Sequence, residues 1–216
     1  MTKEQLLYQI ANIGYSTSYG RDKCYSTADI AGKTTWRFSI IGIFIALAIL
    51  AYPFLGNFVS IGLIATGIAI VALYLRQYTD NKYIETAKKL ETVERELQNL
   101  YFYSKKLNES SLDNAIKTLN KLDKRQKDIS LPTQVFGSDW YAHIKMFWTK
   151  KINSQWYVDE LKLKFFFDKL PFSFFCSCIL ISICTLLIIV GFFIADYLIE
   201  KGQAKTYLEI FTGLCK

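Results

Sequence analysis

The residues that most often carry catalysis or bind metal ions are scarce in this chain. Among 216 residues there is one histidine, His143, which stands among aromatic residues, where a lone histidine is more often structural than catalytic. The five cysteines form no CxxC pair; they are Cys24, Cys176, Cys178, Cys184 and Cys215. No HExxH motif and no supported Ser/His/Asp or Cys/His arrangement occurs. We therefore expect no disulfide framework, no metal site, no cofactor, no evident small-molecule substrate and no enzymatic activity.

One short motif imitates a phosphate-binding loop without meeting its requirements. Gly32-Lys33-Thr34 resembles the end of a P-loop, but Thr27 stands where the first glycine is required. No strand pattern precedes it, so we do not interpret it as a nucleotide site.

Charged residues are absent from two long stretches, Phe38–Leu75 and Pro171–Ala195. A membrane-spanning helix needs about 20 apolar residues, so the first stretch is long enough for two spans and the second for one. Tyr52-Pro53-Phe54-Leu55-Gly56-Asn57 places turn-forming residues near the middle of the first stretch. We therefore expect a hairpin with spans near 38–54 and 58–75. We expect these helices to lie in a membrane, because burying them in a soluble protein would need a far larger chain.

The distribution of lysine and arginine predicts the orientation of these spans. The formal net charge is +7, and the basic excess lies in residues 1–37 and 76–170. Basic residues near span ends favour the cytosolic side. We therefore expect a multi-pass protein of the cell inner membrane with a cytosolic N-terminus and an external hairpin tip. Because Met1–Arg37 is polar, we expect no secretory signal peptide.

Two cytosolic segments have the spacing of amphipathic helices. Apolar residues recur at three- and four-residue steps from Tyr83 to Leu100 and again from Leu112 to Leu122. This pattern indicates either the core of a helical hairpin or a seam between copies of the chain, and the sequence leaves both open.

Aromatic and basic residues are interleaved before the last apolar stretch. Such a pattern is typical of a membrane surface or of stacking on single-stranded nucleic acid, and nearness to the third span favours the membrane. The candidate partner or membrane-surface contacts are Arg21, Lys23, Trp140, Lys145, Trp148, Lys150, Lys151 and Trp156.

The spans themselves carry only mild polarity. The candidate pore-facing residues are Ser60, Thr66, Cys178, Ser182 and Thr185. Ion-coupled transporters usually keep ionisable groups within the membrane, so their absence here disfavours a housekeeping transporter or channel subunit.

The sequence thus predicts an all-α integral membrane fold, with a transmembrane helical hairpin, a third transmembrane helix and cytosolic amphipathic helices. The expected segments are a cytosolic N-terminal helix (1–37), the hairpin (38–75), cytosolic amphipathic helices (76–128), an aromatic and basic juxtamembrane segment (129–170), the third span (171–195) and a tail (196–216).

Residues 14–100 carry a resemblance to a known family. The stretch Tyr15–Lys23 continues through Ala28 and Lys33 to Trp36, and Tyr83–Leu100 follows the hairpin. This order resembles the SLATT family of two-transmembrane effector domains, found in bacterial anti-phage and nucleotide-signalling systems. The resemblance implies a pore-forming membrane effector, silent until infection, that oligomerises and permeabilises the inner membrane. The third span and the aromatic segment depart from the family's pattern.

A second interpretation is a non-conducting membrane anchor or assembly subunit that recruits a cytosolic enzyme or nucleic-acid complex, for example a retron reverse transcriptase with its DNA–RNA product. The expected partners are accordingly the lipid membrane, further copies of the chain, and a cytosolic defence-system protein or nucleic-acid complex.

Overall fold

The computed structural model describes residues 1–57, 59–165, 168 and 171–202, and the regular structure within these ranges is helical, which confirms the all-α prediction. The elements are α1 (Lys3–Ala51), η1 (Pro53–Asn57), α2 (Val59–Arg76), α3 (Lys82–Lys106), η2 (Glu109–Ser111), α4 (Asp113–Ile129), α5 (Ser138–Ile144), η3 (Lys145–Thr149), α6 (Lys151–Glu160) and α7 (Phe172–Glu200). The chain divides into two compact units, Met1–Leu170 and Pro171–Lys216.

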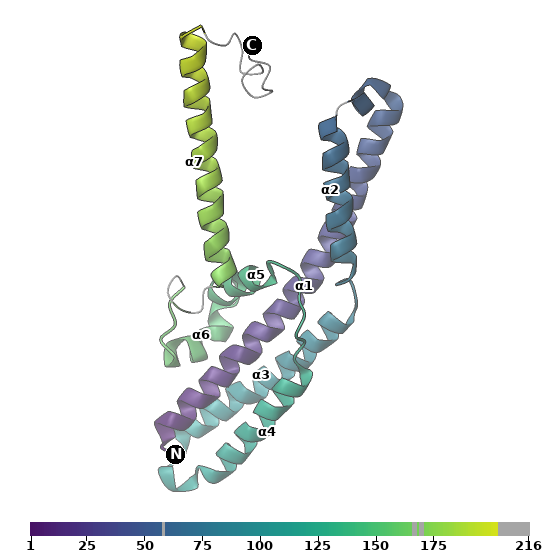
Figure 1. Cartoon of the computed structure of the whole chain (residues 1–216). Coiled ribbons are helices and arrows are strands. Elements are labelled where there is room, and N and C mark those ends of the chain that lie inside the picture. The colour runs from purple at the N-terminus through teal and green to yellow at the C-terminus, as the bar shows by residue number, and fades with distance from the viewer. Residues whose placement is uncertain (58, 166–167, 169–170, 203–216) are drawn as a thin grey trace. The chain divides into compact units, whose positions relative to one another are not determined.

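The first unit is organised around α1, a single helix of 49 residues (Figure 1). A capping box starts it, in which Thr2 accepts a hydrogen bond from Gln5 N and Gln5 Oε1 accepts one from Thr2 N. The helix ends at Ala51, two residues before Pro53, which cannot continue the hydrogen-bond ladder. The predicted N-terminal segment 1–37 and the predicted first span therefore belong to one continuous helix.

The apolar end of α1 and α2 form a helical hairpin. The chain reverses through η1, where the sequence predicts a turn, and α2 returns beside α1 (Figure 1). Its 18 residues span about 27 Å, close to the ~30 Å hydrocarbon thickness of a bilayer. Large apolar side chains point outward on both helices, with Phe44 67% and Leu63 69% exposed. Water disfavours such a surface and lipid accommodates it.

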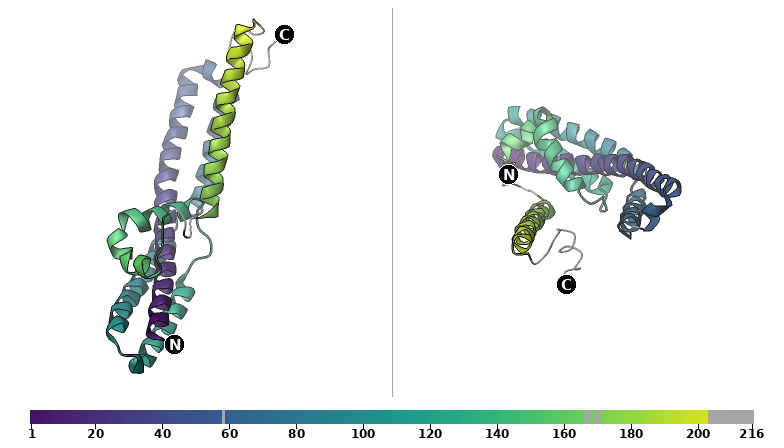
Figure 2. Two further views of the ribbon diagram at one scale, coloured as in Figure 1. Left: turned by 90° about the vertical axis from the view of Figure 1, so that its left-hand side faces the viewer. Right: turned by 90° about the horizontal axis from the view of Figure 1, so that it is seen from above.

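The other part of the first unit is a helical bundle in which α3, α5 and α6 pack on α1 and α4 packs mainly on α3 (Figures 1 and 2). Its core joins Leu6 and Ile10 of α1 to Val93 and Leu97 of α3. The amphipathic stripes predicted from Tyr83 to Leu100 and from Leu112 to Leu122 both face this core. Of the two interpretations left open by the sequence, the structure therefore places these stripes inside the molecule.

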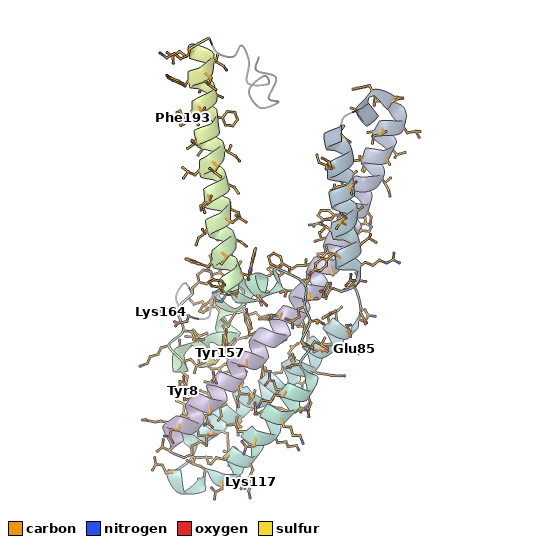
Figure 3. All side chains as sticks on the ribbon, viewed as in Figure 1. Tyr8, Glu85, Lys117, Tyr157, Lys164 and Phe193 are labelled. Atoms are coloured by element: carbon orange, nitrogen blue, oxygen red, sulfur yellow. The ribbon has the colours of Figure 1, made fainter. Side chains whose placement is uncertain are left out.

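The second unit contains α7, which covers the predicted third span and continues to Glu200. Its 29 residues extend about 43 Å, more than a ~30 Å hydrocarbon core requires. Its side chains, including Phe193 (70% exposed; Figure 3), point outward, and Ala195 is the buried residue among those described in it. Residues 203–216, which include most of the predicted tail and Cys215, lie outside the described residues.

By length and composition, α1 and α7 are the two described helices that could cross a membrane, with Ile61–Arg76 forming a shorter apolar helix.

Candidate functional site

A cluster of charged side chains lies inside the bundle, where α1, α3 and the start of α6 meet. We call Arg21, Asp22, Glu94 and Lys150 the buried ion cluster. Arg21 and Glu94 are each 6% exposed and Asp22 is fully buried. The Arg21 guanidinium donates to Glu94 Oε2 and, at 2.9 Å, to Asp22 Oδ1, which also accepts from Lys150 Nζ at 2.6 Å. Two cations thus neutralise two carboxylates.

Hydroxyl groups extend this cluster to α6. Arg21 Nη2 donates to Ser18 Oγ at 3.0 Å, and Tyr157 OH donates to the same oxygen at 2.9 Å. Tyr157 therefore projects from α6 toward α1 (Figure 3), and burial raises its pKa to about 12. Removing one partner of a buried pair leaves an uncompensated charge in the interior, which is strongly destabilising.

Three ion pairs hold the segment from α5 to α6 against α1, and we call them the docking pairs. They are Lys23–Asp139 at 2.6 Å, Lys145–Asp29 at 3.3 Å and Lys150–Asp22 at 2.6 Å. All three connect residues of α1 with partners more than a hundred positions later in the chain. The aromatic and basic segment is thus fixed to the helix that leads into the hairpin.

The pKa values of two carboxyl groups near the cluster are lowered. Burial pushes the pKa of Asp29 upward, but hydrogen bonds from Lys33 and Lys145 outweigh it, and the pKa ends below its ordinary value. The pKa of Glu91 is also lowered, because hydrogen bonds from Arg95 and Tyr25 exceed the opposing effect of burial. Both carboxylates are therefore held in the charged form near neutral pH.

One packing contact in this region depends on a glycine. A Cβ atom on Gly14 would lie 2.3 Å from the edge of the Trp156 indole, which is itself 7% exposed. The indole also packs against Tyr101 and Tyr157, with ring centroids 5.2 and 5.1 Å away. This contact was not predicted from the sequence, since its only signal is a glycine within a helical pattern.

The predicted surface-contact residues occupy different environments. Arg21 and Trp156 are buried, and Lys23, Lys145 and Lys150 form the docking pairs. Trp148 is 76% exposed and Lys151 is exposed. Trp140 is partly buried beside Phe136, with ring centroids 5.2 Å apart.

The predicted pore-facing residues lie on exposed helix faces where their side chains are described. Thr66, Ser182 and Thr185 each donate a 2.8 Å hydrogen bond to a carbonyl of their own helix, so their polarity is satisfied locally. Cys178 is exposed on α7. The side chain of Ser60 lies outside the described residues.

The first unit also contains a cavity of about 250 Å³ between α1, α3 and the segment after α4. Tyr15, Tyr19, Lys23, Cys24 and Gln134 contribute to its lining. Among the described residues, no group of histidine, cysteine, aspartate and glutamate could hold a metal ion.

An all-α fold in which an apolar hairpin is continuous with a charged helical bundle is the architecture of a membrane protein. The chain belongs to the family of SMODS and SLOG-associating 2TM effector domain 6, which matches residues 1–179. Neither a curated protein nor a solved structure matches the chain. The family match is wider than the resemblance over 14–100, and it corrects one expectation, because the aromatic segment before α7 lies within the family domain.

Proposed function

We propose that this protein is an effector of bacterial anti-phage defence that, when triggered, oligomerises and permeabilises the inner membrane. The family match, whose description is a two-transmembrane effector domain, supports the effector role. The observation that carries the mechanism is the continuity of α1 from the buried ion cluster to the tip of the hairpin. A rearrangement of the bundle would be transmitted to the membrane through this helix.

The buried ion cluster and the docking pairs would hold the resting state. They connect α1 to α3, α5 and α6 through contacts that are compensated only in this arrangement. A trigger that separates α1 from these partners would release the hairpin. In this mechanism the protein acts by rearranging its helices in the membrane and not by enzymatic chemistry.

The proposed permeabilisation requires several copies of the chain, because the two helices of one hairpin cannot surround a channel. The outward face of α2 has room for a neighbour at Gly62, since an added Cβ atom there meets nothing within 4 Å. Thr66 lies on an exposed face of the same helix. In the proposed oligomer, small residues on this face allow helices of different copies to approach closely.

The test is a dye-based measurement of membrane potential in cells that express the chain without a silencing partner. We expect depolarisation and arrested growth as in abortive infection, and we expect Gly62→Leu to reduce both. Ser182→Leu on α7 tests the third span in the same way. Membrane potential and growth that stay intact, even after phage infection, would rule out permeabilisation.

A second candidate function is a non-conducting anchor that recruits a cytosolic enzyme or a nucleic-acid complex. The observation that favours it is the exposure of large apolar side chains on the bundle, with Trp148 76% and Ile152 87% exposed. Affinity purification tests it. The full chain is used and not a fragment without α1, because α1 forms part of the core of the bundle. Three results together would favour the anchor. The wild type recovers a reverse transcriptase or nuclease, Ile152→Lys does not, and cells that express the wild type keep their membrane potential.

A further inference from the structure

Three aromatic residues lie close together in the chain, in a segment of the first unit that contacts the C-terminal end of α2. We call Phe136, Trp140 and Tyr141 the aromatic collar. Phe136 is 65% and Tyr141 41% exposed, although large apolar and aromatic side chains usually avoid water. Phe136 and Trp140 pack edge to face with centroids 5.2 Å apart. Phe136 and Trp140 therefore present one joined aromatic surface, and Tyr141 follows Trp140 directly on α5.

A direct contact fixes the collar to the end of the hairpin. The backbone N–H of Phe136 donates to Tyr74 OH at 3.3 Å. Tyr74 lies in the last turn of α2, whose final residue is Arg76. Tyrosine and tryptophan at such positions usually lie at the membrane–water boundary, where the ring is apolar and the polar group is wet. The collar thus continues the surface of the hairpin at the level where the hairpin would leave the bilayer.

Basic side chains surround this level on both helices of the hairpin. Lys33 and Arg37 on α1 and Arg76 on α2 are exposed. Lys145 lies 4.3 Å from the centroid of the Tyr141 ring and pairs with Asp29, which also accepts Lys33. Two lysines share the single Asp29 carboxylate, and Arg37 and Arg76 add two further positive charges, so the local charge is positive. Positive charge beside exposed aromatic rings matches an anionic lipid surface.

We infer that the aromatic collar inserts into the headgroup layer of the inner leaflet and binds anionic phospholipid there. This inference rests on the proposed function, since that proposal places the hairpin in the membrane. Because Asp139 of α5 pairs with Lys23, the lipid contact is mechanically linked to α1 and hence to the bundle. Nucleic acid is the weaker candidate, because stacking requires free ring faces and Trp140 is partly buried.

The test is photocrosslinking of the full chain in vesicles, with benzoylphenylalanine placed at single positions. Phe136 and Tyr141 report on the collar. Tyr8, at the far end of α1, and Tyr103 of α3 are matched controls, being 56% and 58% exposed. Phe44 and Leu73 report on the hairpin in the membrane. We expect lipid adducts at the collar and hairpin positions at least five-fold above those at Tyr8 and Tyr103.

Varying the lipid composition distinguishes binding of anionic lipid from mere nearness to the bilayer. We expect adducts at Phe136 to rise at least two-fold when phosphatidylglycerol replaces part of a phosphatidylcholine bilayer, whereas adducts at Phe44 should not change. A yield of lipid adducts at Phe136 no higher than at Tyr8 would overturn the inference. Crosslinks from Phe136 to a second copy of the chain would overturn it as well. In both cases, lipid adducts at Phe44 would still support insertion of the hairpin. Added oligonucleotide that removes the Phe136 adducts would also overturn it. Absence of adducts at Phe44 and Leu73 would instead refute the membrane location itself.

Discussion

At the scale of single residues, the contact between Gly14 and Trp156 decides how closely α6 approaches α1. Gly14→Ala puts a methyl group 2.3 Å from a buried indole, and such overpacking costs about 1–3 kcal/mol. Gly32→Ala in the same helix meets nothing within 4 Å and should stabilise the helix by about 0.5–1 kcal/mol. Thermal unfolding in detergent, followed by circular dichroism, should show opposite shifts. Equal shifts for the two variants would contradict this packing.

The buried ion cluster makes a second prediction at this scale. Glu94→Gln removes one carboxylate from a compensated pair, and the uncompensated buried charge should cost about 3–5 kcal/mol. Glu96→Gln on the same helix breaks an exposed pair with Arg125 and should cost about 0–1 kcal/mol. Chemical denaturation of both variants measures the difference. A cost for Glu94→Gln no larger than that for Glu96→Gln would show that the cluster does not stabilise the resting state.

The lowered pKa of Asp29 predicts how one ion pair responds to acid. A carboxyl group whose pKa is lower in the folded state stabilises the fold above its unfolded value of 3.8, and the contribution is lost as the pH falls below that value. Asp29→Asn should therefore lower the unfolding temperature at pH 7, and its difference from the wild type should shrink as the pH approaches 3. A difference that stays constant with pH would mean that Lys33 and Lys145 do not act through this carboxylate.

At the scale of helices, the proposed mechanism requires α1 to be unbroken between the bundle and the hairpin. Gly32→Pro removes a helix hydrogen bond and kinks α1 at a position that no other side chain contacts, at a local cost of about 3 kcal/mol. We expect this variant to insert into the membrane and keep its helical content but to depolarise cells less than Gly32→Ala. Full depolarisation by Gly32→Pro would mean that the hairpin acts without α1 as a connection.

The helices were largely predictable from the sequence, but their boundaries and partners were not. The uncharged stretches and the turn at Pro53 and Gly56 were strong local signals, since both reflect properties of neighbouring residues. The continuity of α1 was not predicted, because the polar segment 1–37 was expected to be a cytosolic helix separate from the first span. Within this segment, Arg21 contacts Glu94 of α3 and Ser18 contacts Tyr157 of α6, and contacts between residues that distant in sequence leave no periodic pattern.

The candidate surface residues illustrate the same limit. Arg21 and Trp156 were predicted as partner or membrane-surface contacts because aromatic and basic residues alternate around them, yet both are buried by partners on other helices. Trp148 and Lys151 have no such burial and are exposed. Sequence alone identified the composition of the segment, whereas the tertiary contacts decided which of its residues face inward.

At the scale of the whole molecule, the two features that matter for the proposed function lie in the first unit. A charged bundle is stabilised by internal ion pairs, and the helix at its centre continues into an apolar hairpin. The family match covers this unit completely and reaches residue 179 of α7. We therefore expect the first unit to contain both the regulated part and the membrane-active part of the effector.

The most direct test of permeabilisation is potassium release from vesicles that contain the purified full chain. We expect release above that of protein-free vesicles, and several-fold faster release with Glu94→Gln than with Glu96→Gln, because only the first variant weakens the buried ion cluster. Helical content and carbonate-resistant insertion confirm that each variant is intact. The proposed function would be contradicted if the wild type and Glu94→Gln are both properly inserted and their vesicles release potassium no faster than protein-free vesicles.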